Sequence, residues 1–87
     1  MKFKVGDKVS VKTWNEMLEN ERVQLDHRGD IWETGRSYTF GKRMRRFCGR
    51  VAIVREINLN NEIKLCFNEF GDVEFIFRDW MLEPKDI

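Results

Sequence analysis

The sequence is poor in proline, in cysteine and in long apolar runs. Its 87 residues include one proline, Pro84, and no apolar run that approaches a membrane span. A spanning helix needs about 20 consecutive apolar residues, so we expect no membrane association. The basic N-terminus is not followed by the roughly 7–15 apolar residues of a secretory signal, and we therefore expect a cytoplasmic protein.

The two cysteines form no recognisable motif. Cys48 and Cys66 are 18 positions apart, and no CxxC spacing occurs. Free thiols are the expected state in a reducing compartment, and a single disulfide is the alternative. The arginines at positions 46 and 50 flank Cys48, and neighbouring cations can lower the pKa of a thiol.

Motifs for metal binding and catalysis are also absent. The only histidine, His27, lies between Asp26 and Asp30, and no second histidine or suitably spaced cysteine completes a set of three or four ligands. Turn chemistry explains this segment better, with Gly29 at positive φ. The chain contains no GxSxG, HExxH, GxxxxGK[ST] or GxGxxG. We predict no enzyme activity, no catalytic residue, no metal and no cofactor.

What the chain does contain is enough apolar material for one core. Hydrophobic residues make up 41% and aromatic residues 13%, including seven Phe and three Trp. We expect a single domain over residues 1–87. The net charge of +1 conceals an asymmetry: residues 1–50 carry 12 Lys/Arg and 7 Asp/Glu, whereas residues 51–87 carry 4 and 8. Such polarity can indicate a bound polyanion, a protein partner or internal ion pairs.

The hydrophobic pattern predicts mainly strands. Alternation over 8–12 predicts a first strand, and a capping box at Thr13 predicts a short helix over 14–21. Residues 22–37 are expected to be ordered but irregular, and a brief helix should follow over 41–47. A three-stranded meander is predicted over 50–57, 62–67 and 73–77. A 3₁₀ turn near 78–81 should then lead to a short last strand.

Three segments carry a resemblance to a known fold. Val5-Gly6-Asp7-Lys8-Val9, the run Cys48-Gly49-Arg50-Val51-Ala52-Ile53-Val54, and Trp80-Met81-Leu82-Glu83-Pro84 are similar to small SH3-like barrels of the KOW and Tudor kind. The chain also resembles uncharacterised small proteins of gut bacteria and their prophages. The resemblance implies a mainly β barrel of about five strands, with a long, partly helical insertion over 13–49 after the first strand. It implies no particular activity, because such barrels host many functions.

Two sets of residues are candidate binding sites. The first is a basic segment that could bind phosphates, made of Lys42, Arg43, Arg45, Arg46 and Arg50. The alternative is that these cations are only the solvated face of a short helix. The second set comprises aromatic residues that could contact a partner: Trp32, Tyr38 and Phe70. We predict a noncatalytic binding or accessory module that binds nucleic acid through the basic segment; the alternative is a protein-interaction or assembly subunit using exposed aromatics and the acidic C-terminal half.

Overall fold

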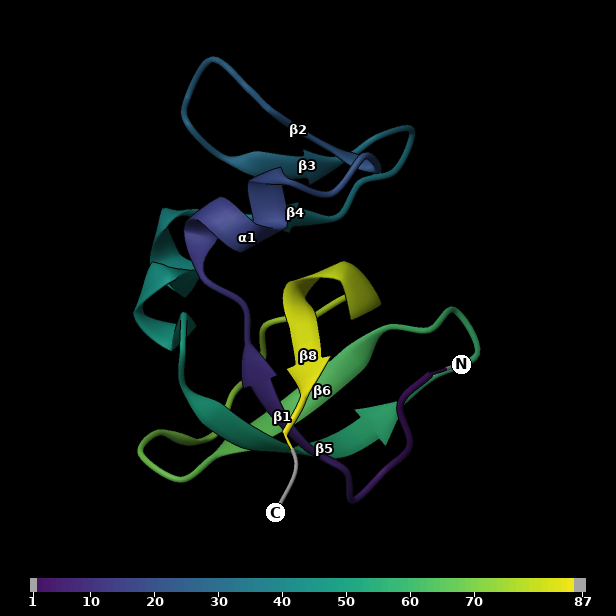
Figure 1. Cartoon of the computed structure of the whole chain (residues 1–87). Coiled ribbons are helices and arrows are strands. Elements are labelled where there is room, and N and C mark those ends of the chain that lie inside the picture. The colour runs from purple at the N-terminus through teal and green to yellow at the C-terminus, as the bar shows by residue number, and fades with distance from the viewer. Residues whose placement is uncertain (1, 86–87) are drawn as a thin grey trace.

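The structure is a computed structural model that describes residues 2–85. Two antiparallel sheets lie one above the other (Figure 1). The larger sheet has the order β7-β6-β5-β1-β8, with β1 at Lys8–Val11, β5 at Val51–Ile57, β6 at Ile63–Phe67, β7 at Gly71–Asp72 and β8 at Leu82–Pro84. The smaller sheet has the order β2-β3-β4, with β2 at Val23–Leu25, β3 at Ile31–Glu33 and β4 at Thr39–Phe40.

Three short helices connect the strands. They are α1 at Trp14–Leu18 and two 3₁₀ helices, η1 at Lys42–Phe47 and η2 at Asp79–Met81. The capping box at α1 is confirmed, because Glu16 N–H donates to Thr13 Oγ1 at 3.3 Å and Thr13 N–H donates to Glu16 Oε1 at 3.0 Å. The helix ends at Leu18 and not at residue 21. The reason is local: the side chain of Asn20 accepts from Arg22 N–H at 2.8 Å and so favours a turn.

Residues 22–37 are more regular than expected. They form the hairpin of β2 and β3, and β4 adds to it as an edge strand. Asp26 fixes the hairpin loop, since its carboxylate accepts from the backbone N–H of Arg28 and Asp30 and from Trp32 Nε1. Gly29 has φ +85°, as expected for the turn. The outer face of the segment is exposed and therefore polar. This polar composition explains why the sequence did not indicate the short strands.

One apolar cluster lies between the two sheets. The alternating residues of β1 and β6 point into it, and Trp80 closes it from η2. The insertion contributes buried side chains of its own, namely Met17, Ile31, Phe40, Met44 and Phe47. The connection from β1 to β5 is therefore anchored in the core at several points along its length.

The prediction of a mainly β fold is confirmed. The predicted insertion over 13–49 contains two short helices, α1 and η1, but it also contains the second sheet, which the sequence did not predict. Within residues 2–85 the five-stranded sheet is open, with β7 and β8 as its edges. The predicted strand over 73–77 is also wrong: β7 ends at Asp72, and only Phe77 returns to bridge with Ile63.

Candidate nucleic-acid interface

The basic segment forms η1, and its 3₁₀ geometry sorts the side chains into rows. A 3₁₀ helix has three residues per turn, so residues i and i+3 lie above one another. Met44 and Phe47 make up the buried row. The other two rows are exposed cations: Lys42 with Arg45, and Arg43 with Arg46. The helix therefore presents four cations to solvent while its apolar row anchors it in the core.

Two of these cations are held over aromatic rings. The guanidinium of Arg45 lies 3.8 Å from the ring centroid of Trp14, and that of Arg46 lies 5.6 Å from the centroid of Phe70. Such cation–π contacts restrain the side chains and leave their charge at the surface. Arg50 differs from the others, because its Nη1 lies 2.8 Å from Glu69 Oε2. Glu69 thus offsets the charge of Arg50, and the four cations of η1 make up the rest of the candidate surface.

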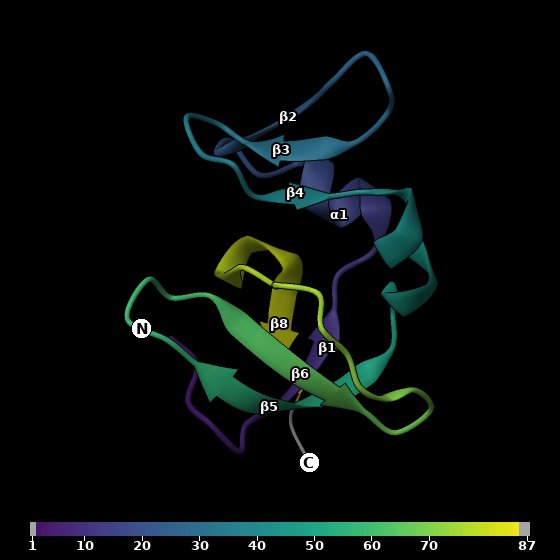
Figure 2. The same cartoon turned by 180° about the vertical axis from the view of Figure 1, so that it is seen from behind.

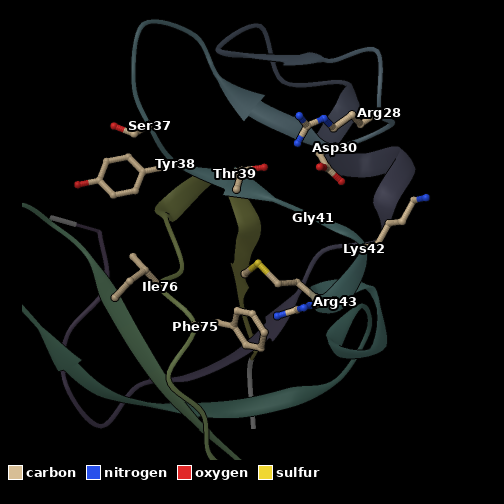
Figure 3. A pocket seen from close by; sticks show the side chains of 11 residues that line it. Arg28, Asp30, Ser37, Tyr38, Thr39, Gly41, Lys42, Arg43, Phe75 and Ile76 are labelled. Carbon is tan, nitrogen blue, oxygen red and sulfur yellow. The ribbon is translucent and has the colours of Figure 1, made fainter.

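A groove of about 610 Å³ opens beside η1. Figure 3 shows β4 and Gly41 on one side of it, Phe75 and Ile76 on the other, and Lys42 and Arg43 at one end. Arg28 and Asp30 reach the same end from the β2–β3 loop. Three cations and one carboxylate thus border the groove. Its lower wall, formed by Phe75 and Ile76, is apolar. Of the aromatic candidates from the sequence, Tyr38 alone lines this groove.

The lower wall exists because the chain leaves β6 after β7. Cys66 pairs with Asp72, but the next bridge joins Ile63 to Phe77. Three steps along β6 therefore correspond to five steps along the other chain, and the two extra residues bulge away from the sheet. Figure 2 shows this segment rising from the larger sheet toward the smaller one. The bulge carries Phe75 and Ile76 into the groove.

The upper wall is the open edge of β4. Glu33 N–H donates to Tyr38 O at 2.9 Å, and Thr39 is opposite Trp32 in the register. Antiparallel pairs alternate between hydrogen-bonded and non-bonded, so the backbone N–H and C=O of Thr39 point away from β3. Since β4 is an edge strand, they point toward the groove that Thr39 lines.

A buried polar network fixes the far end of the groove. Arg78 Nε lies 3.1 Å from Glu33 Oε1, and Trp80 Nε1 donates to the same oxygen at 2.6 Å. The guanidinium of Arg78 lies 4.3 Å from the ring centroid of Tyr38, whose hydroxyl donates to Glu62 Oε2 at 2.6 Å. The network ties the smaller sheet to the larger one and holds the Tyr38 ring in place.

This network also sets the charge state of Glu33. Burial alone would raise the pKa of its carboxyl group, but the hydrogen bonds from Arg78 and Trp80 outweigh burial, and the pKa lies below its ordinary value. Glu33 is therefore ionised at neutral pH and forms a buried ion pair with Arg78.

The other aromatic candidates lie elsewhere. Trp32 is on the outer face of the smaller sheet, where its Nε1 donates to Asp26 Oδ2 at 2.6 Å. Phe70 is 40% exposed at the β6–β7 turn, with its ring edge against Phe47. Trp32, Tyr38 and Phe70 therefore do not form one surface.

Neither cysteine is activated. Both are free. The neighbouring arginines do not lower the pKa of Cys48, because burial raises it and outweighs the charge of Arg45. The pKa of Cys66 is raised by a hydrogen bond with Asp72 and by burial. Within residues 2–85 no three His, Cys, Asp or Glu side chains are grouped so that they could hold a metal ion.

Sequence reasoning missed several residues of the groove and its support. Arg28 comes close to η1 only through the fold of the β2–β3 loop, and Thr39 lies between the irregular segment expected over 22–37 and the helix expected over 41–47, where no element was predicted. Phe75 and Ile76 were predicted to lie in a regular strand, because no residue of the 73–77 segment indicated a bulge. Glu33 and Arg78 are 45 positions apart, so their pairing had no sequence signature.

Comparison of the chain with protein-family models, curated proteins and solved structures found no match. In the described part of the chain, no helix has the length and apolar character needed to cross a bilayer. The features of this chain that bear on function are the geometry of η1 and of the groove.

Proposed function

We propose that this protein is a noncatalytic module that binds nucleic acid through η1. The observation that carries the proposal is the set of four exposed cations on one anchored 3₁₀ helix, with Arg28 beside them. Lys and Arg bind phosphates without regard to sequence, and rigidly held cations lose less conformational freedom on binding. Within residues 2–85, neither Lys42 nor Arg43 has an ion pair or a side-chain hydrogen bond, so both are available to a ligand.

The strand order and the free cysteines support two related proposals, one on the fold and one on the location of the protein. In the larger sheet β1 lies between β5 and β8, and η2 precedes the last strand. We infer from this order an open SH3-like barrel in which the second sheet replaces the usual first loop. The two free thiols fit a cytoplasmic location, where such thiols stay reduced.

The salt dependence of binding tests the proposal. Five phosphate contacts on a single strand should give a log–log slope of about −3.5, from roughly −0.7 per contact. Affinity should then fall about 100-fold between roughly 50 and 200 mM salt. In a Lys42→Met/Arg43→Met variant the slope should drop to about −2, because two contacts are lost. Fluorescence anisotropy with a labelled mixed-sequence oligonucleotide measures both quantities.

A matched control separates a site from general charge. Lys4→Met/Lys85→Met removes the same charge at exposed positions away from η1, and it should keep the slope of the unmodified protein. Equal loss in both double variants would show that only net charge matters and would contradict a site on η1. Binding that does not change with salt, or no binding at the lower salt, would overturn the proposal and favour a protein partner.

A further inference from the structure

We infer that the groove between β4 and the 73–76 bulge receives one unstacked base of a single strand. This inference rests on the proposed function, since the cations of η1 must first hold the phosphates. It goes further by assigning a site for the base and by making single-stranded nucleic acid the preferred ligand. A duplex keeps its bases stacked and paired, so it can offer this groove only its backbone.

The dimensions and lining of the groove suit a planar aromatic ligand. Its volume of about 610 Å³ is within the roughly 300–1,000 Å³ typical of small-ligand sites. Phe75, Ile76 and Met44 give it an apolar lining, and Phe75 is half-buried with its ring packed edge-on against Phe47 at 5.6 Å. A ring fixed in this way is a stacking platform that every base can use.

Unpaired backbone groups supply the polar contacts. Within residues 2–85, the N–H and C=O groups of Glu74, Phe75 and Ile76 make no hydrogen bond to other backbone groups. On the opposite wall, the backbone of Thr39 points outward from the β4 edge. The unpaired backbone groups of Phe75 and Ile76 on one wall, and of Thr39 on the other, are therefore available to the edge of a base. Because backbone groups of both kinds are present, the site is expected to accept more than one base.

The charges lie where the flanking phosphates would be. Lys42 and Arg43 begin η1 at one end of the groove, and Arg28 reaches the same end from the β2–β3 loop (Figure 3). A base in the groove places its own phosphate near this end, and Arg45 and Arg46 continue the cationic path along η1. Asp30 is the one carboxylate of the lining and lies at this same end, where it offsets part of the charge of the three cations.

The wall needs no rearrangement to receive a base. Tyr38 is held by Arg78 on one face and by Glu62 at its hydroxyl. Met44 and Phe47 fix the start and end of η1 in the core. Preorganisation of this kind lowers the entropic cost of binding.

The direct test uses the unmodified protein and ligands that differ only in their bases. The probes are a labelled single strand of thymidines, a backbone of equal length with abasic sugars, and a hairpin duplex. We expect the single strand to bind roughly 5- to 140-fold more tightly than the abasic strand, the range that one stacked base provides. The salt slopes of the two should be equal, because their phosphates are the same. The duplex should not show the additional affinity that a stacked base gives to the single strand.

A pair of variants locates the base. Phe75→Leu keeps an apolar side chain but removes the stacking ring, and it should abolish the preference for bases while keeping the salt slope. Leu59→Ala is the control, because Leu59 is fully exposed outside both the groove and η1, and it should keep the preference.

Equal binding of the thymidine and abasic strands, with the salt slope intact, would overturn the base site and leave the proposed function standing. A preference lost equally in both variants would also overturn the assignment to this groove. No salt-dependent binding of any strand would overturn the proposed function itself.

Discussion

Replacing Glu33 by Gln should lower the free energy of unfolding by about 3–5 kcal/mol. The substitution keeps the size of the side chain but leaves the guanidinium of Arg78 buried without its counter-charge. Domains of this size have total stabilities of roughly 5–15 kcal/mol, so the variant should lose a large fraction of its stability. Urea denaturation followed by tryptophan fluorescence measures the change, since Trp80 donates to the same carboxylate.

The control is the exposed pair of Arg50 and Glu69. Both of its side chains are about half exposed, and Glu69→Gln should cost less than about 1 kcal/mol. A double variant, Glu33→Gln with Arg78→Met, should be less destabilised than the sum of the single changes, because it leaves no unpaired charge. If Glu33→Gln costs no more than Glu69→Gln, the network does not hold the two sheets together.

The dependence of stability on pH tests the role of Glu33 in a second way. The pKa of Glu33 is depressed in the folded protein, so its contribution is fully present above the unfolded value of 4.5. That contribution is lost as the pH falls from there through the folded pKa. The unmodified protein should therefore lose stability below about pH 4.5, and Glu33→Gln should lack this part of the decline.

Replacing Phe47 by Ala should cost about 3–5 kcal/mol. The ring is fully buried and stacks on Phe67 with a centroid distance of 4.7 Å, and the edges of Phe70, Phe75 and Phe77 meet it. Its loss opens a cavity beneath η1 and removes the support of the lower groove wall. Chemical denaturation gives the stability, and oligonucleotide affinity should fall as well.

Phe70→Ala is the matched control for this change. The ring of Phe70 is 40% exposed and should contribute about 1 kcal/mol or less. If Phe47→Ala is as mild as Phe70→Ala, then η1 is not anchored by its apolar row. In that case the ordered display of cations would have no structural basis.

Local patterns in the sequence were sufficient for most elements of the larger sheet. Alternation located β1 and β6, the β-branched run over 50–57 located β5, and the spacing of Met44 and Phe47 located η1 with its buried row. The capping box located the start of α1. Each of these signals depends on neighbours within one or two turns or along one strand. Sequence periodicity reports such short-range relationships directly.

The groove and its supporting network could not be derived in this way. The bulge after β7 depends on which residue of β6 faces Phe77, a question of register that the apolar run 73–77 does not answer. The hairpin of β2 and β3 has strands of three residues with exposed outer faces, too short for a clear alternation. The pairing of Glu33 with Arg78 joins distant segments through the fold alone.

The most direct test of the central claim is a map of binding on the backbone amides. The ¹⁵N-labelled protein would be titrated with a short single strand of thymidines at low salt. We predict that the largest chemical-shift changes fall in residues 38–46 and 73–77, the two walls of the groove and η1. The cations Lys4 and Lys85 should show little change. Shifts that spread over all exposed cations, or that leave both walls unchanged, would contradict a nucleic-acid site at this groove.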